Sequence, residues 1–174
     1  MEINTKRLII RPFIDSDLEQ FKKLLTIKEV EGWIKQQDRA KQFLNWHISN
    51  YATMDIINGI VCFGIFNLHT GDIVGATGAG KHDDLNETEV FYHLLSEYRG
   101  QGYATEAAKA VTEWALESYN LNKIIATIEV ENESSKRVIE RIGYRCKEKK
   151  ELFINIINTK KLFVYYEYEK GNTF

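Results

Sequence analysis

Residues 98–107 combine two glycines and an alanine at the point where a strand-like pattern changes into a helical one. The first turn of a helix leaves several backbone N–H groups without partners, and these groups lie at the positive end of the helix dipole. A phosphate group binds well to such a helix end. Gly100, Gly102 and Ala104 have small side chains or none, so a ligand can approach the backbone closely. These residues predict a phosphate or pyrophosphate site, and with it a nucleotide-like cofactor.

Two common phosphate-binding motifs do not fit this loop. A P-loop requires a lysine directly after its last glycine, but Tyr103 follows Gly102. A dinucleotide-binding loop follows an N-terminal strand and has a third glycine where this chain has Thr105. A tight strand-to-helix turn without a ligand is the remaining alternative for the glycine pair taken alone.

Two titratable side chains precede the loop. Glu89 and His93 lie on the predicted strand 89–95, where a spacing of four residues places both on one face. Either can act as a general base that takes a proton from a substrate. For each residue taken singly, the sequence favours a structural role, as a carboxylate at the edge of the core or a hydrogen-bonded histidine. Tyr92 lies on the opposite face, and we expect it to pack.

The hydrophobic pattern that surrounds these residues predicts an α/β (α+β) protein with a mixed sheet of about seven strands and about four helices. The predicted strands are 7–13, 59–68, 73–80, 89–95, 123–130, 144–153 and 160–169. The predicted helices begin near 15–19 and cover 37–48, 104–119 and 133–142. Ser16 and Glu19 have the spacing of a capping box at the first helix. One proline and no linker-like segment indicate a single domain, 1–174.

Composition excludes several classes of protein. The chain has 23 basic and 25 acidic residues, and this balance argues against a nucleic-acid-binding protein. It has neither a signal peptide pattern nor a membrane-spanning run, so we expect a cytoplasmic protein without a membrane partner. Cys62 and Cys146 are predicted to be small core residues, and 82–84 (His-Asp-Asp) to be a solvated turn. We therefore expect no disulfide and no metal site.

The loop resembles the acyl-CoA motif of the GNAT superfamily of N-acetyltransferases. That motif reads Arg/Gln-x-x-Gly-x-Gly/Ala, and Arg99, Gly102 and Ala104 match it. The resemblance implies an acyl-CoA N-acyltransferase-type fold with a mostly antiparallel central sheet.

Other segments extend the resemblance over essentially the whole chain. Residues 5–12 (Thr-Lys-Arg-Leu-Ile-Ile-Arg-Pro) look like the opening of the branch that includes the ribosomal-protein N-terminal acetyltransferases. Residues 74–75 (Val-Gly) fall where that branch has a strand glycine. Residues 132–135 and 141–144 are similar to its Asn-x-x-Ser helix start and its Gly-aromatic pair.

The resemblance implies acetyl-CoA as co-substrate. The strand before the glycine loop would bind the pantetheine arm through its backbone, the loop would bind the pyrophosphate, and an asparagine would hydrogen-bond the cofactor. The residues that match these positions are Leu94, Leu95, Arg99, Gly100, Gln101, Gly102, Tyr103, Ala104, Thr105 and Asn132.

The resemblance also implies direct acetyl transfer to a primary amine, without an acyl-enzyme. Backbone N–H groups near Leu94 or Leu95 would stabilise the oxyanion. Many members of the superfamily place a tyrosine, as the general acid, where this chain has Ile139. The resemblance to the ribosomal-protein branch suggests Ser135, the serine of Asn-x-x-Ser, as the substitute acid. The alternative is that Ser135 only caps its own helix. Glu89 and His93 are the candidate bases.

The amine acceptor depends on how strong a base the protein supplies. An α-amine costs about 1 kcal/mol to deprotonate at pH 7, whereas a lysine or polyamine amine costs about 4.6 kcal/mol. Without an obvious strong base, a protein N-terminus is the first expectation. A small amine (polyamine, amino acid derivative or aminoglycoside) is the second, and a non-catalytic acyl-CoA sensor is the third. A homodimer through a sheet edge is compatible with the sequence.

We expect the acceptor side to be built from the region 33–51, strand 7–13 with the helix that follows it, and the hairpin 155–159. Trp33, Trp46 and Tyr51 are aromatic residues that can line a pocket there. Aromatic residues at helical spacing belong more often to the core, and this second interpretation is favoured.

Overall fold

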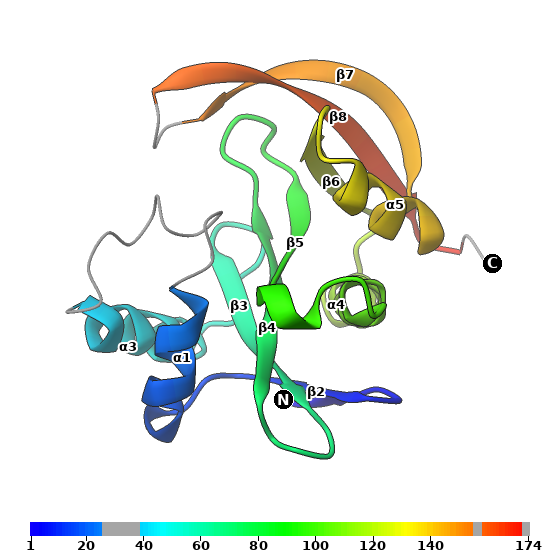
Figure 1. Cartoon of the computed structure of the whole chain (residues 1–174). Coiled ribbons are helices and arrows are strands. Elements are labelled where there is room, and N and C mark those ends of the chain that lie inside the picture. The colour runs from blue at the N-terminus through cyan, green and yellow to red at the C-terminus, as the bar shows by residue number, and fades with distance from the viewer. Residues whose placement is uncertain (26–38, 155–157, 172–174) are drawn as a thin grey trace.

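The computed structural model describes residues 1–25, 39–154 and 158–171. These residues form one sheet of 8 strands in the order β1-β2-β3-β4-β5-β6-β8-β7, with helices against both faces (Figure 1). The strands are β1 (Ile3–Asn4), β2 (Leu8–Arg11), β3 (Ile60–Asn67), β4 (Ile73–Lys81), β5 (Thr88–Leu94), β6 (Lys123–Glu129), β7 (Arg145–Ile154) and β8 (Thr159–Glu169). Neighbouring strands pair antiparallel except β5 and β6, which are parallel. The mixed, mostly antiparallel sheet is confirmed, with one strand more than predicted. That strand, β1, has only 2 residues and is too short to show a pattern.

The α-helices lie close to their predicted positions. They are α1 (Leu18–Leu24), α3 (Ala40–Asn50), α4 (Tyr103–Ser118) and α5 (Glu133–Arg141), and short 3-10 turns cover Asp15–Asp17 and Ser96–Tyr98. In Figure 1, α1 and α3 lie on one side of β3 and β4, and α4 and α5 lie on the other. Alanines and a valine on the buried face of α4, at 107, 108, 111 and 115, let this helix pack closely on the sheet.

The predicted capping box at the first helix is wrong. Asp17, rather than Ser16, caps this turn, because its carboxylate accepts a 2.9 Å hydrogen bond from the N–H of Ile14. The same carboxylate forms a bidentate ion pair with the guanidinium of Arg11, at 2.7 and 2.9 Å. This partner lies on β2, so the cap depends on a contact that the helix sequence alone does not contain. Glu19 pairs with Lys22 at the surface instead.

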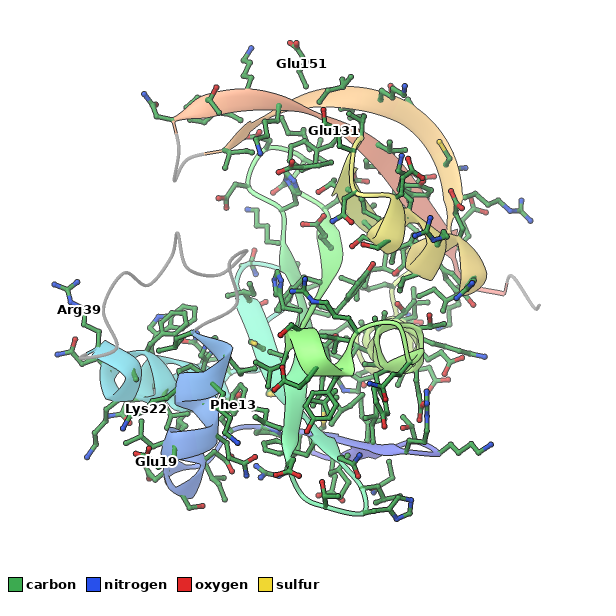
Figure 2. All side chains as sticks on the ribbon, in the orientation of Figure 1. Phe13, Glu19, Lys22, Arg39, Glu131 and Glu151 are labelled. Carbon is green, nitrogen blue, oxygen red and sulfur yellow. The ribbon has the colours of Figure 1, made fainter. Side chains whose placement is uncertain are left out.

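The sheet separates two hydrophobic cores. The larger one lies beneath α4 and α5, and the smaller one lies beneath α1 and α3 around Phe13, Phe21 and Leu44. Figure 2 shows Phe13 between α1 and the sheet, whereas Glu19 and Lys22 point outward. His47 is buried in the smaller core against four aromatic rings, and burial lowers its pKa to about 4. This histidine is therefore neutral at physiological pH.

Strand β7 forms one edge of the sheet, and most of its side chains are exposed. The charged run 147–151 is confirmed as an edge segment, as expected of strands that avoid pairing with other chains. Cys62 is buried as predicted, but Cys146 is exposed on β7, so the prediction of a core residue is wrong there. Both cysteines are free. Few residues near Cys146 are apolar, and Cys146 is exposed because β7 is an edge strand.

The turn at 82–84 connects β4 to β5. The carboxylate of Asp84 accepts a 2.9 Å hydrogen bond from the N–H of Phe153 and so links this turn to β7. Among the described residues, no three His, Cys, Asp or Glu side chains are placed to hold a metal ion. In the same part of the chain, each helix is too short or too polar to traverse a membrane.

Candidate active site

Strands β5 and β6 separate after a single pair of residues. Glu89 pairs with Ile125, and the next N–H on β6, that of Thr127, donates to the Glu89 carboxylate at 2.7 Å. The Thr127 hydroxyl donates to the same carboxylate oxygen at 2.5 Å. The Glu89 side chain thus takes the position that a backbone carbonyl of β5 would occupy in a continuous ladder. Beyond this point the two strands diverge.

The divergence leaves backbone groups of β5 without a strand partner. Leu95 donates its N–H to the carbonyl of Val74 on β4 at 3.0 Å. Successive residues of a strand direct their backbone groups to opposite sides, so those of Tyr92 and Leu94 point away from β4 and toward the gap. Such a strand can hydrogen-bond an extended ligand through its backbone.

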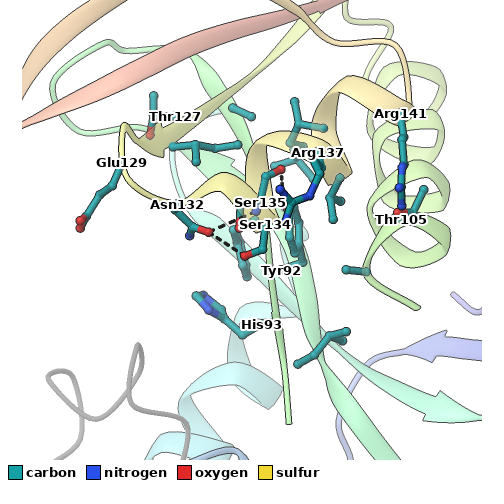
Figure 3. A pocket seen from close by; sticks show the side chains of 18 of the residues that line it. Tyr92, His93, Thr105, Thr127, Glu129, Asn132, Ser134, Ser135, Arg137 and Arg141 are labelled. Carbon is teal, nitrogen blue, oxygen red and sulfur yellow. Dashed lines mark hydrogen bonds between the residues drawn. The ribbon is translucent and has the colours of Figure 1, made fainter. Parts of the chain in front are cut away.

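A cavity of about 520 Å³ lies in this gap, within the usual size range of small-molecule sites. Its walls come from β5, β6, the loop 99–102, the first turn of α4, and α5 (Figure 3). Glu89, His93, Leu94, Asn132 and Ser135 all line it, as do Arg99, Gly100, Gly102, Ala104 and Thr105 of the loop and helix start. The structure therefore brings most of the predicted site residues together.

The glycine loop has the backbone that a phosphate site requires. Gly100 and Gly102 have φ angles of +75° and +82°, which favour glycine, and Gly102 is the N-cap of α4. The first bond of the helix runs from the N–H of Glu106 to the carbonyl of Gly102. The N–H groups of the three residues between them, 103–105, consequently have no partner within the helix. A Cβ atom on Gly100 would meet no atom within 4 Å. The open space and the unpaired donors fit a pyrophosphate.

Three residues predicted to contact the cofactor do not line the cavity: Leu95, Gln101 and Tyr103. The N–H of Leu95 is used in the sheet, as described above. The Gln101 side chain donates to the carbonyl of Glu97 at 2.8 Å. The Tyr103 ring packs against Tyr98 and the guanidinium of Arg7. The side chains of Gln101 and Tyr103 therefore lie on the outer side of the loop.

Arg99 fixes the loop to the end of β5. Its Nε atom donates to the carbonyl of Leu94 at 3.1 Å. The carbonyl of Leu94 is therefore engaged, while the N–H of the same residue faces the gap. We expect this N–H, and not the carbonyl, to be available to a ligand.

Asn132 and Ser135 meet at the start of α5. The Oδ1 atom of Asn132 accepts the N–H of Ser135 at 3.1 Å and the hydroxyl of Ser134 at 2.9 Å, as Figure 3 shows. Asn132 is therefore the N-cap of α5, which is a structural reason for the Asn-x-x-Ser pattern. Both bonds of Asn132 use Oδ1 and leave its Nδ2 group to other partners. The hydrogen bonds of Ser135 use its backbone, so its hydroxyl is not committed to the cap.

Tyr92 packs against the larger core, as predicted, and it also borders the cavity. It lines the cavity, and its hydroxyl donates to the carbonyl of Ser135 at 3.1 Å. Burial raises the pKa of this phenol to about 12, so it keeps its proton at neutral pH. Strand alternation places Tyr92 opposite Glu89, but it does not reveal that α5 and its cavity cover that opposite face. The position of the missing tyrosine, Ile139, is fully buried.

Glu89 and His93 both line the cavity. Burial raises the pKa of Glu89, although the hydrogen bonds from Thr127 and the charge of His82 partly oppose this. A carboxylate with a raised pKa is a better proton acceptor than an exposed one. His93 lies 6.3 Å from the ring of Phe91 and extends into the opening below Asn132 in Figure 3.

Two arginines that the sequence analysis did not select line the wall formed by α5. Arg137 and Arg141 are exposed and one helical turn apart, and both line the cavity (Figure 3). Among the described residues, neither guanidinium group has a salt bridge or a side-chain hydrogen bond, although the charge of Arg137 helps to lower the pKa of Glu133. Guanidinium groups bind phosphate well. Their spacing on the helix and their position before Gly143 were the available signals.

The aromatic residues predicted on the acceptor side do not line this cavity. Tyr51 is partly buried and packs against both cores. Its hydroxyl donates to the carbonyl of Cys62 at 2.5 Å and accepts the N–H of Phe13 at 3.1 Å. Trp46 stacks on Phe43 at the surface. Trp33 and residues 155–157 of the predicted hairpin, like residues 37–38 of the predicted helix, lie outside the described residues.

Comparison with known proteins identifies the family. The model of the acetyltransferase (GNAT) domain matches residues 7–145, which include β5, the glycine loop and α5. The chain belongs to the GNAT acetyltransferase family. The uncharacterized N-acetyltransferase YnaD of Bacillus subtilis is 30% identical to this GNAT enzyme over 149 residues, 83% of each chain.

Solved structures share the fold of this GNAT enzyme. A putative ribosomal-protein-serine acetyltransferase from Vibrio cholerae superimposes with a TM-score of 0.79 at 20% identity, over 97% of both chains. RimL, a ribosomal L7/L12 alpha-N-protein acetyltransferase solved in complex with coenzyme A, also has a TM-score of 0.79, at 13% identity over 97% of this chain and 98% of RimL. At these identities the likeness establishes the fold.

Proposed function

We propose that this GNAT acetyltransferase transfers the acetyl group of acetyl-CoA directly to a primary amine, with a protein N-terminal α-amine as the preferred acceptor. The observation that carries the proposal is the shared cavity of the glycine loop and the diverging strands β5 and β6. One wall offers the unpaired N–H groups of 103–105 to a pyrophosphate, and another offers backbone groups of β5 to the pantetheine arm.

Different residues of the cavity bind different parts of acetyl-CoA. Gly100, Gly102 and the start of α4 hold the pyrophosphate, and the N–H of Leu94 faces the pantetheine and the thioester. Arg137 and Arg141 bind phosphate oxygens at the nucleotide end, because they are the arginines on the wall formed by α5. The Nδ2 group of Asn132 is a further donor toward the pantetheine.

The transfer requires that the protein stabilise an oxyanion, accept a proton from the amine and donate a proton to the thiolate. The amine nitrogen bonds to the thioester carbon and gives a tetrahedral oxyanion, which the N–H of Leu94 stabilises. The carbon–oxygen double bond then re-forms and the carbon–sulfur bond breaks, releasing the thiolate of coenzyme A. Glu89 or His93 takes the proton that leaves the amine, directly or through water. The hydroxyl of Ser135 gives a proton to the departing thiolate, and Tyr92 holds the backbone of Ser135 in place.

The preference for an α-amine rests on the cost of deprotonating the amine and on the relatives. An α-amine needs about 3 to 4 kcal/mol less for deprotonation at pH 7 than a lysine or polyamine amine does. RimL, which shares the fold, acts on a protein α-amine according to its name. A small amine remains the second candidate acceptor, and the partly structural roles of Glu89 and Ser135 support a non-catalytic acyl-CoA sensor as the third candidate.

A panel of amines tests the proposal. Release of free thiol from acetyl-CoA is measured with N-terminal peptides, spermidine, lysine and aminoglycosides, and the melting shift on addition of acetyl-CoA is recorded in parallel. We expect a melting shift and turnover that is fastest with peptides. Turnover with a small amine alone would make the small amine, and not a protein N-terminus, the acceptor. A melting shift without any turnover would indicate a non-catalytic acyl-CoA sensor. The absence of a melting shift would contradict the cofactor site. Size-exclusion chromatography of the same samples shows whether the chain is a monomer or a homodimer, which the sequence leaves open. We retain a cytoplasmic location as a prediction.

A further inference from the structure

Arg7 packs against the outer side of the glycine loop. This residue belongs to the opening segment 5–12, which the proposed chemistry does not use. Its Nη1 atom donates to the carbonyl of Gln101 at 2.9 Å, and its guanidinium lies 4.4 Å from the centre of the Tyr103 ring. Its Nε atom forms an ion pair with Glu106 at 2.7 Å. One side chain thus contacts the loop, the first residue of α4 and the carboxylate one turn into that helix.

Glu106 joins the same two segments through its carboxylate. One oxygen accepts the Thr5 hydroxyl at 2.7 Å and the N–H of Arg7 at 2.8 Å, while the other accepts the Arg7 side chain. Burial acts to raise the pKa of Glu106, but these hydrogen bonds outweigh it and lower the pKa, so the carboxylate is ionised at neutral pH. The beginning of α4 is thereby fixed to the residues that precede β2.

These contacts lie opposite the cavity. Gly100, Gly102 and Ala104 line the cavity, whereas the carbonyl of Gln101 and the ring of Tyr103 contact Arg7. Gly102 lies between the two sides, because a Cβ atom there would be 3.4 Å from Nη2 of Arg7. Arg7 itself does not line the cavity. Gly100 and Gly102 are conformationally free in the absence of other restraints, so a carbonyl held from outside limits the arrangements that the loop can adopt.

We propose that Arg7 is a positioning residue that holds the N–H groups of the glycine loop in the arrangement that binds pyrophosphate. This inference rests on the proposed use of acetyl-CoA. The planar guanidinium reaches the Gln101 carbonyl and the Glu106 carboxylate at once, which the single ammonium of a lysine cannot do with the same geometry. Arg7 thus affects a ligand that it does not touch.

The chain provides a matched control for this arginine. Arg11, at the other end of the same segment, also pairs with a carboxylate, that of Asp17, and also lies over an aromatic ring, that of Phe66. Its contacts are in the core beneath α1 and not at the loop. Loss of Arg11 and loss of Arg7 therefore remove similar interactions, but only Arg7 restrains the glycine loop.

The experiment compares Arg7→Gln, Arg7→Lys and Arg11→Gln with the parent chain by two measurements. Calorimetry gives the Kd of acetyl-CoA, and competition gives that of acetyl-pantetheine, which lacks the pyrophosphate. Hydrogen exchange of peptides covering 99–106 is followed without any ligand. We expect Arg7→Gln to raise the Kd of acetyl-CoA about 10-fold, with less effect for Arg7→Lys, to leave the Kd of acetyl-pantetheine unchanged and to speed exchange in the loop. Arg11→Gln should change neither the ratio of the two Kd values nor exchange in the loop.

Equal changes in both Kd values, or unchanged loop exchange in Arg7→Gln, would overturn the inference. Failure of the parent chain to bind acetyl-CoA would instead overturn the proposed function, and the inference about the cofactor with it. The exchange measurement needs no ligand, so it shows separately whether Arg7 restrains the loop.

Discussion

Glu89 accepts two hydrogen bonds from Thr127, one from its backbone N–H and one from its hydroxyl, at the point where β5 and β6 stop pairing. A side chain thus ends the parallel ladder and satisfies the first β6 donor beyond it. The opening between the strands begins there, and the cavity occupies it. One residue combines two possible roles, as the cap of the ladder and as a proton acceptor.

Two substitutions separate these roles of Glu89. Glu89→Gln keeps an oxygen that can accept from Thr127 but cannot take up a proton, so we expect kcat to fall about 100-fold with an unchanged Kd for acetyl-CoA. Glu89→Leu removes the acceptor as well and should also lower the melting temperature and raise that Kd. Parental kcat in Glu89→Gln would show that Glu89 is only a cap.

The pH dependence of the rate provides a further check on Glu89. A general base works in its deprotonated form, so kcat/KM should fall as pH decreases through the pKa of Glu89. Because burial raises this pKa, the fall should occur above the usual range of a glutamate. The rate profile of Glu89→Gln should lack this step, whereas persistence of the step would assign it to another group such as His93.

Ser135 and Ser134 differ in what their hydroxyls do, although they are neighbours. The Ser134 hydroxyl is used by Asn132, whereas the hydrogen bonds of Ser135 come from its backbone. We expect Ser135→Ala to lower kcat about 10- to 100-fold without changing the Kd of acetyl-CoA, and Ser134→Ala to affect mainly stability. Steady-state kinetics and calorimetry provide both values. If Ser135→Ala keeps the parental kcat, Ser135 is not the acid, and Tyr92→Phe becomes the next variant to measure.

Arg141 is expected to bind a phosphate of acetyl-CoA. Loss of a charged hydrogen-bond donor costs about 1.5 kcal/mol or more, so Arg141→Gln should raise the Kd of coenzyme A about 10-fold. If the bound group is the 3′-phosphate, the Kd of dephospho-CoA should stay the same. Arg145→Gln is the control, because Arg145 is an exposed arginine of β7 that does not line the cavity. A parental Kd for coenzyme A in Arg141→Gln would exclude this role.

Stability should decrease in mild acid because of His47. Its pKa is about 4 in the folded protein and about 6.5 in the unfolded chain, so the unfolded state binds the proton first as pH decreases below 6.5. The stabilisation is present above pH 6.5 and is lost between pH 6.5 and 4. We expect the free energy of unfolding to be about 2 kcal/mol lower at pH 5 than at pH 8 through this residue. Denaturant unfolding of His47→Phe should show a smaller difference, and an equal difference would assign the effect to other groups.

Local patterns predicted the elements, but they did not predict distant contacts. The small residues of α4 and the glycine loop before it are a continuous signal, and both are where the sequence places them. The contacts of Asp17 and Arg7 could not be read from the local pattern. Asp17 pairs with Arg11 on strand β2, and Arg7 pairs with Glu106, which is 99 positions away. The packing of Tyr92 was predicted, but its place in the cavity wall was not, because alternation distinguishes two faces without showing which one α5 covers.

The binding of acetyl-CoA by the glycine loop is tested most directly by calorimetry on Gly102→Asp and Gly71→Asp. Both glycines have positive φ angles, +82° and +74°, so both substitutions strain the backbone by about 1–2 kcal/mol. Of these two glycines only Gly102 lines the cavity, so an aspartate there adds a negative charge to the loop that is proposed to bind the pyrophosphate. Its Cβ atom would also lie 3.4 Å from Nη2 of Arg7, so the substitution alters the contact between Arg7 and the loop as well. We expect Gly102→Asp to raise the Kd of acetyl-CoA at least about 100-fold while Gly71→Asp keeps the parental value. The same Kd in the parent chain and in folded Gly102→Asp would contradict the assignment of this loop.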